Sequence, residues 1–156
     1  IGHNIEKHPV IFKKIIDNGH SIGNHTFNHV NGWKTATEEY LENSNQWSAV
    51  SSQSPNCKLQ TANCKLFRPP YGKIKVSQFK KLRQLGYKII MWDVLSADFD
   101  TQISPEKCLQ NVLQNVAPGS IIVFHDSLKA FPNLEYTLPK ALKYWRKKGF
   151  VCDSIK

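Results

Sequence analysis

The segment Ser120-Ile121-Ile122-Val123-Phe124, followed by His125 and Asp126, decides the predicted fold. It starts after the turn Pro118-Gly119 and has no polar residue between Ile121 and Phe124. A strand in a parallel sheet is covered on both faces, so its sequence is a continuous apolar run rather than an alternation. Functional groups gather at the carboxyl ends of such strands. We therefore expect a buried parallel strand with His125 as a candidate functional residue.

Helical and extended patterns alternate along the rest of the chain. Apolar residues recur at helical spacing in 6–18, 35–50, 76–85, 104–116 and 137–148, and short apolar runs indicate strands at 21–26, 65–68, 87–92 and 150–155. Residues 51–63 and 93–100 are predicted loops, and Thr35 is the expected N-cap of its helix, paired with Glu38. Alternation without hairpin signals predicts an α/β protein with a parallel sheet.

Five predicted strands are fewer than the roughly eight that close a small barrel. Either the sheet is open, or further strands precede residue 1. At 156 residues and 40% hydrophobic residues, the chain has the size of a single domain with a full core. We treat 1–156 as that one domain.

Charge and hydropathy exclude several classes of protein. No apolar run approaches 18 residues, so no membrane span is expected. The formal net charge of +9 favours acidic partners, nucleic acid or an anionic cell-wall polymer among them. The lysines are spread along the chain, however, and no nucleic-acid-binding motif accompanies them. We therefore expect a solvated basic surface and no nucleic-acid partner.

His25 and His29 form the strongest candidate metal site. Neutral imidazole is the commonest side-chain metal ligand, and a spacing of four residues puts both rings on one face if the segment is helical. Two histidines do not complete a coordination shell, so a third ligand or water is required. Isolated pairs of this kind are common, and this pair gains weight from its position after a predicted strand.

Chemically capable residues also follow the other predicted strands. Arg68 stands at the end of the second strand, where Pro69-Pro70 stops the ladder. Asp98 follows the third strand, and His125 follows the fourth. Because the carboxyl ends of parallel strands meet at one edge, we expect these side chains to share a rim.

These residues together resemble the motifs of the polysaccharide deacetylase family, carbohydrate esterase family four. The resemblance spans nearly the whole chain, and four motifs match in order and spacing: His25-Thr26-Phe27-Asn28-His29, Arg68-Pro69-Pro70-Tyr71, Asp98-Phe99 with Phe in place of Trp, and Val123-Phe124-His125 with Val in place of Leu. The resemblance implies an irregular (β/α) barrel, here incomplete or open at the N-terminal side. It also implies removal of N-acetyl groups from amino-sugar polymers, peptidoglycan or chitin-like, in the cell envelope or outside the cell.

The resemblance assigns a role to each matched residue. His25 and His29 would hold a divalent metal, most commonly Zn²⁺. His125 would be the general acid that protonates the departing amine, and Asp98 would orient it. Tyr71 would offer its backbone N–H to the oxyanion.

The remaining roles concern substrate contacts and a carboxylate. Arg68 would fix a catalytic carboxylate by paired hydrogen bonds. Val123 and Phe99 would line the acetyl pocket, and Trp92 is a further candidate for the substrate-binding set, as either a core residue or a sugar platform.

The main departure concerns the first motif of the family, two neighbouring aspartates on the first strand. Nothing before His25 matches them, and Asp17, in a predicted helix, is a poor substitute. We expect the chain to begin after the first one or two strands. Asp93 and Asp126 are weaker candidates for a replacement carboxylate. The alternative function is therefore a catalytically inactive carbohydrate-binding domain or fragment.

Cysteines and tryptophans complete the expectations. Cys57 and Cys64 flank a polar loop and could form a disulfide in an exported protein, whereas Cys108 and Cys152 are expected to be buried. The large indole rings are expected in the core rather than on the surface, namely Trp33, Trp47 and Trp145.

Overall fold

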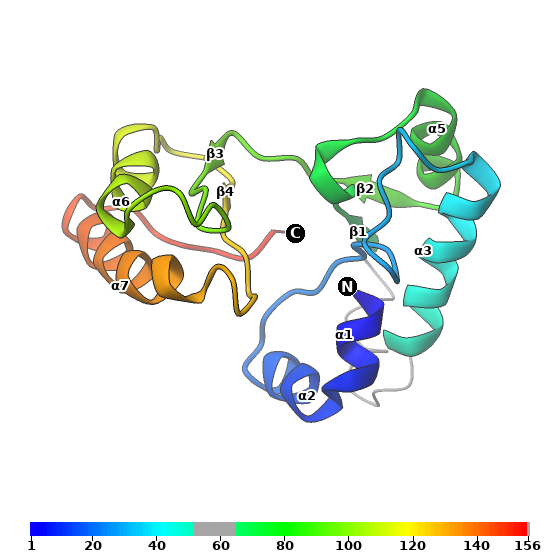
Figure 1. The fold of residues 1–156 in the computed structure, drawn as a ribbon, viewed down its shortest axis with the longest axis horizontal. Helices are drawn as coiled ribbons and strands as arrows, with labels where there is room; N and C mark the ends of the chain where they lie inside the picture. Colours follow the sequence, from blue (N-terminus) through cyan, green and yellow to red (C-terminus); the bar gives the residue numbers. More distant parts are fainter. Residues whose placement is uncertain (52–64, 156) are drawn as a thin grey trace. The chain divides into compact units, whose positions relative to one another are not determined.

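A computed structural model describes residues 1–51 and 65–155. The chain divides into two compact units, one formed by Ile1–Met91 with the chain end from Ser154, the other by Trp92–Asp153. Figure 1 shows the elements of both. No helix in the described ranges is long and apolar enough to cross a membrane. The predicted loop at 51–63 and the possible Cys57–Cys64 pair lie outside the described residues, apart from Ser51.

The N-terminal segment forms two helices, α1 (Gly2–Lys7) and α2 (Pro9–Asp17). The prediction of one helix over 6–18 was wrong because Pro9 has no N–H to donate and disfavours helical backbone at the preceding residue. His8 accordingly adopts φ −130° between the two helices. Phe12 and Ile16 are the buried residues of α2, as its apolar spacing predicts.

The helix α3 (Thr37–Ser51) begins later than predicted. Thr35 is not its cap, because the Thr35 hydroxyl donates to the Asn31 carbonyl at 2.8 Å. Two glutamates in the first turn complement the helix dipole instead, Glu38 and Glu39.

Strand β1 (Lys65–Phe67) pairs in parallel with β2 (Tyr87–Ile89) in the first unit. The predicted strand at 21–26 is reduced to a bridge between Asn24 and Phe67. Helix α5 (Val76–Gln84) lies beside β2 and ends before Gly86, whose φ is +86°. The core packs the aromatic rings of Tyr40, Phe67 and Tyr87 with Leu82.

The second unit also contains one parallel strand pair. Strand β3 (Val94–Leu95) pairs with β4 (Ile122–Val123). The central strand of the prediction is thus present but short, and the segment at 93–100 is not wholly a loop. Helix α6 (Pro105–Gln114) starts as predicted, with Ser104 accepting from the Lys107 N–H.

The last helix, α7 (Phe131–Lys147), starts earlier than the predicted residue 137. It packs against α6 (Figure 1), and together they cover a core of Val94, Val112, Ala141 and Trp145. Residues 150–155 form no ladder with any described residue, contrary to the predicted strand.

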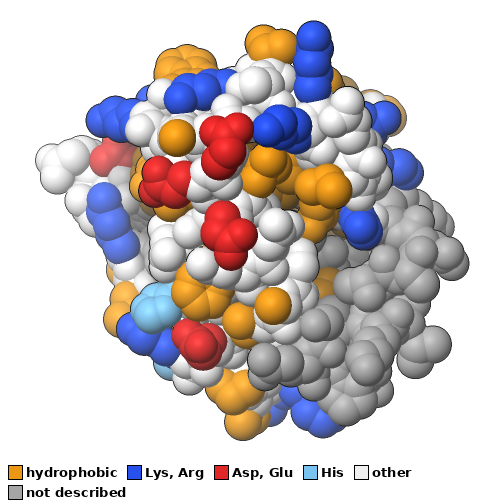
Figure 2. Space-filling view, turned by 90° about the vertical axis from the view of Figure 1, so that its right-hand side faces the viewer, with side chains coloured by type: hydrophobic (Ala, Val, Ile, Leu, Met, Phe, Trp, Pro, Cys, Tyr) orange, Lys and Arg blue, Asp and Glu red, His pale blue; other side chains and the backbone are white. Residues whose placement is uncertain are grey.

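Burial confirms part of the predicted core. Trp47 and Trp145 are buried, but Trp33 is 61% exposed, so the prediction that it belongs to the core was wrong. Cys108 is buried as expected, whereas Cys152 is exposed. Figure 2 shows acidic, basic and hydrophobic side chains intermixed on one face of the molecule, without one basic patch there.

Candidate active site

The loop after Asn24 brings His25 and His29 together. Their ring centroids are 4.8 Å apart at an interplanar angle of 64°. The segment is not helical: Thr26 and His29 both adopt left-handed backbone, with φ 61° and 56°. Two left-handed residues, Thr26 and His29, therefore shape the turn between the two rings, and such residues are uncommon outside glycine and point to a functional constraint.

A hydrogen bond fixes the orientation of the His25 ring. His25 Nδ1 lies 2.6 Å from the carbonyl oxygen of Arg68. A carbonyl accepts, so Nδ1 carries the proton and Nε2 keeps a free lone pair. Burial, together with the nearby charges of His29 and Arg68, lowers the pKa of His25 to about 4 against the opposing effect of this hydrogen bond. The ring is therefore neutral at pH 7.

Buried amides that sequence reasoning did not single out hold this loop. Asn24 Oδ1 accepts from the Thr26 N–H at 2.9 Å, and Asn24 Nδ2 donates to the Ser44 carbonyl at 2.9 Å. From α3, Asn43 accepts the Phe27 N–H with its carbonyl and the Asn28 N–H with its side chain. Several hydrogen bonds from α3 thus hold the strained turn in place. An asparagine next to a candidate ligand is the sequence signal that could have suggested it.

Arg68 and Tyr71 lie on the loop after β1. The Arg68 N–H donates to the Asn24 carbonyl, and Arg68 Nε lies 3.4 Å from the carbonyl of Ile90. Burial lowers the pKa of the guanidinium. The turn η1 (Pro70–Gly72) gives Tyr71 a left-handed φ of 58°, and the exposed Tyr71 ring meets the His29 ring edge-on at 4.6 Å. The first unit therefore brings His25, His29, Arg68 and Tyr71 together.

The second unit pairs Asp98 with His125. Asp98 is fully buried, and its Oδ1 lies 2.7 Å from His125 Nδ1, while its Oδ2 accepts the His125 backbone N–H at 2.7 Å. Ser96 donates a third hydrogen bond to Oδ1 at 3.0 Å. Burial opposes ionisation of Asp98, but these donors outweigh it and hold its pKa below the ordinary value. The carboxylate fixes the proton on Nδ1 and leaves Nε2 available for proton transfer.

The loop that carries Asp98 depends on Asn133 of α7, a residue that sequence reasoning missed. Asn133 Nδ2 donates to the carbonyls of Asp98 and Asp100, at 3.2 and 3.3 Å. Ala97, next to Asp98, is left-handed with φ 60°. The side-chain amide thus adds a support from α7 to a turn that Ser96 and Asp98 also stabilise from within the loop.

We expect Asn133→Ala to lower the free energy of unfolding by about 1–3 kcal/mol, because two carbonyls lose a buried donor. Urea unfolding followed by circular dichroism measures it. Asn115→Ala is the matched control, since Asn115 Nδ2 also donates to a carbonyl, that of Asn111, but is exposed. Equal losses in the two variants would contradict the special role of Asn133.

The structure places the predicted substrate-binding residues in the second unit. The Phe99 ring meets the His125 ring edge-on at 4.8 Å and is 38% exposed. Val123 is buried on β4, where its carbonyl accepts the Ser96 N–H. Trp92 is half-buried at the start of this unit. That these residues contact a substrate, and that both groups share one rim, stay predictions.

His25 and His29 fit two positions of a divalent metal site. Both rings are partly exposed, and the hydrogen bond from His25 Nδ1 to the Arg68 carbonyl leaves Nε2 available. Within 1–51 and 65–155, no group of three or more His, Cys, Asp or Glu residues could hold a metal. Asp17 pairs with Lys13 on α2, and in the second unit Asp93 accepts from Ser120 and Ile121.

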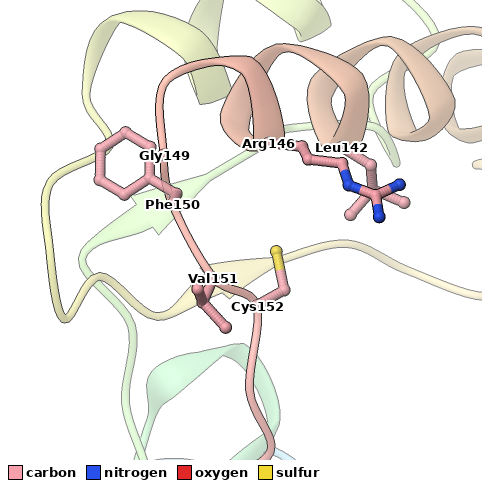
Figure 3. Close-up of a pocket in the computed structure, with 6 residues that line it drawn as sticks. All are labelled: Leu142, Arg146, Gly149, Phe150, Val151 and Cys152. Atoms are coloured by element: carbon pink, nitrogen blue, oxygen red, sulfur yellow. The ribbon is translucent and has the colours of Figure 1, made fainter.

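One hollow of the second unit is lined by none of the predicted site residues. It measures about 570 Å³ and is lined by the end of α7 and the segment that follows, with Arg146, Phe150 and Cys152 among its residues (Figure 3). It contains no histidine or carboxylate. The candidate functional residues therefore form two side-chain groups, one in each unit, and neither group lines this hollow.

Comparison with known proteins decides the family. The family model "Polysaccharide deacetylase" matches residues 1–90, more than half of the chain. The chain belongs to the polysaccharide deacetylase family. A peptidoglycan-N-acetylglucosamine deacetylase of Bacillus cereus is 36% identical over 127 residues, which cover 81% of this chain and 44% of that protein. The chain thus spans less than half the length of this relative.

Solved structures confirm the fold. The crystal structure of a peptidoglycan N-acetylglucosamine deacetylase has a TM-score of 0.87 and 31% identity, covering 99% of this chain and 70% of its own. A wild-type pseudoenzyme of carbohydrate esterase family four from Bacillus anthracis has a TM-score of 0.79 and 20% identity, covering 96% and 50%. The predicted fold class, α/β with a partial (β/α) barrel of this family, is therefore confirmed.

Proposed function

We propose that the protein is a metal-dependent hydrolase that removes N-acetyl groups from amino-sugar polymers, peptidoglycan or chitin-like. Membership of the deacetylase family supports the class of reaction. The observation that carries the proposal is the pair Asp98–His125. A fully buried carboxylate with three donors, two of them from a partly exposed histidine, prepares that imidazole to move a proton.

The reaction breaks the amide C–N bond. Water adds to the acetyl carbon, acetate leaves, and the sugar nitrogen takes a proton to become an amine. His125 Nε2 delivers that proton, while Asp98 holds Nδ1–H and stabilises the charged ring. Tyr71 N–H is the proposed donor to the oxyanion, and the half-buried guanidinium of Arg68 adds positive charge.

His25 and His29 would hold the metal, most commonly Zn²⁺. When bound, the metal supplies Lewis-acid chemistry for the acetamide carbonyl and for water. The neutral state of His25 and the proton fixed on Nδ1 suit this role. The carboxylate base of the family's first motif has no counterpart before His25 in this sequence.

An inactive carbohydrate-binding protein is the second candidate function. The observation that favours it is that the described residues supply two histidines to the metal site and no third ligand of the usual types. Under this reading the protein binds oligosaccharide through the same loops and releases no acetate.

Acetate release tests the proposal. We expect the protein, supplied with Zn²⁺, to release acetate from N-acetylglucosamine oligomers or from peptidoglycan, and to lose this activity in excess chelator. Readdition of zinc should restore it. Oligosaccharide binding that persists in chelator, with no acetate formed under any condition, would instead establish the inactive binding protein.

A further inference from the structure

Trp33 is exposed and yet fixed in orientation. Its ring is 61% exposed, but its Nε1–H donates to the carbonyl of Ile74 at 3.3 Å. Lys73 Nζ lies 5.2 Å from the ring centroid. These two contacts restrict the rotation of an indole that solvent alone would leave free to rotate. The ring therefore presents a large apolar surface at a low cost in conformational entropy.

The loop beneath Trp33 is packed tightly against the loop that leads into α5. Gly32 approaches it so closely that a Cβ would lie 2.3 Å from the carbonyl oxygen of Lys73. The fully buried amide of Gln78 donates to the carbonyls of Gly32 and Thr35, at 2.9 and 3.2 Å. Lys75 Nζ donates to Thr35 as well, at 2.7 Å. The platform is thus rigid before any ligand binds.

The two loops that hold Trp33 are also the loops of the first-unit site. One is the loop after Asn24, which carries His29 and Trp33, and the other is the loop after β1, which carries Tyr71 and Ile74. The loops are in contact where the His29 and Tyr71 rings lie 4.6 Å apart, and again where the Trp33 indole donates a hydrogen bond to the Ile74 carbonyl. Four residues of extended chain span at most about 14 Å, so the Cα atoms of His29 and Trp33 lie within that distance. A short oligosaccharide is long enough to span this distance.

We propose that Trp33 is a stacking platform for a neighbouring sugar of the same polymer, beyond the sugar whose acetyl group reacts. This rests on the proposed function for its substrate class. The electron-rich face of the indole attracts the C–H groups on the apolar face of a pyranose ring, and the buried area adds to affinity. Lys73 occupies one face, so the sugar takes the other.

Titration of the unmutated protein with N-acetylglucosamine tetramer tests the platform directly. The Trp33 indole N–H signal, assigned by its loss in Trp33→Phe, should shift on saturation, with no turnover required. Trp33→Ala should bind the tetramer at least about tenfold more weakly, as expected for a buried aromatic anchor, and Trp33→Phe should keep most of the affinity. Phe79→Ala, which removes another exposed ring of the same unit, is the control.

The outcomes separate this inference from the proposed function. A shifted indole signal without acetate release would overturn the deacetylase assignment and retain the platform. Acetate release with an unmoved Trp33 signal would retain the enzyme and overturn the platform. For an active protein, Trp33→Ala should lower kcat/KM for the tetramer and leave that for the monosaccharide unchanged.

Discussion

The variant His25→Ala should take up essentially no zinc. Loss of an outer partner of a metal ligand alone costs about 10–100-fold in affinity, so loss of the ligand itself should cost at least about 100-fold. The expectation depends on the fixed tautomer: the bond from Nδ1 to the Arg68 carbonyl reserves Nε2 for the metal. Zinc content after dialysis and the apparent Kd from chelator competition measure the effect.

A second variant and a matched control make this result decisive. His29→Ala should show the same loss, since the two rings lie 4.8 Å apart and are proposed to hold one ion. His8→Ala removes an exposed histidine of the same unit and should bind zinc as the unmutated protein does. Circular dichroism confirms that each variant is folded. Zinc content equal in all three variants would end the metal assignment.

The fold could be predicted from sequence where local signals determine an element. Ser104-Pro105-Glu106 sets the start of α6, because a side-chain cap, a proline and an acid all suit the first turn. In α7 only one part of this signal is present, because Pro132 stands in the first turn without a side-chain cap or an acid, and the helix starts before the predicted residue 137. The break at Pro9 was equally local and was overlooked.

Strand lengths could not be predicted because pairing sets them. The apolar run 120–124 contributes two residues to a ladder, and 21–26 contributes the bridge at Asn24. A ladder extends only as far as a partner strand does, and partners are distant in sequence. The same limitation applies to Trp33. Its large apolar ring suggests burial, but the residues around it in the fold leave it exposed.

For the candidate site too, some features could be predicted from the sequence and others could not. The candidate residues could be chosen from four motifs after four predicted strands, and the structure brings His25 to His29 and Asp98 to His125. Their roles in the chemistry stay predictions. How they are held could not be predicted, because the supports are amides from distant helices. Asn43 of α3 and Asn133 of α7 carry no motif, and they act through backbone atoms of the site loops.

The largest effect on turnover, with metal uptake unchanged, is expected for His125. We expect His125→Ala to lower kcat by about 100-fold to 10⁴-fold, the usual range for loss of a general acid. The departing amine is a poor leaving group unless protonated, so the loss should fall on the C–N cleavage step. Because the ring is 38% exposed, added imidazole can enter the space left by the side chain and should restore part of the rate.

Asp98→Asn distinguishes a general acid from a ring that is only structural. The amide keeps the shape of the side chain but removes the charge that fixes Nδ1–H, so kcat should fall while zinc content stays unchanged. Imidazole should not rescue this variant, because His125 still fills its place. Lys129 is an exposed residue of the loop that carries His125, and the control variant Lys129→Ala should turn over substrate at the normal rate. If His125→Ala keeps its full rate, the proton comes from another residue, and the role of Asp98 is to hold the loop that Asn133 supports from α7.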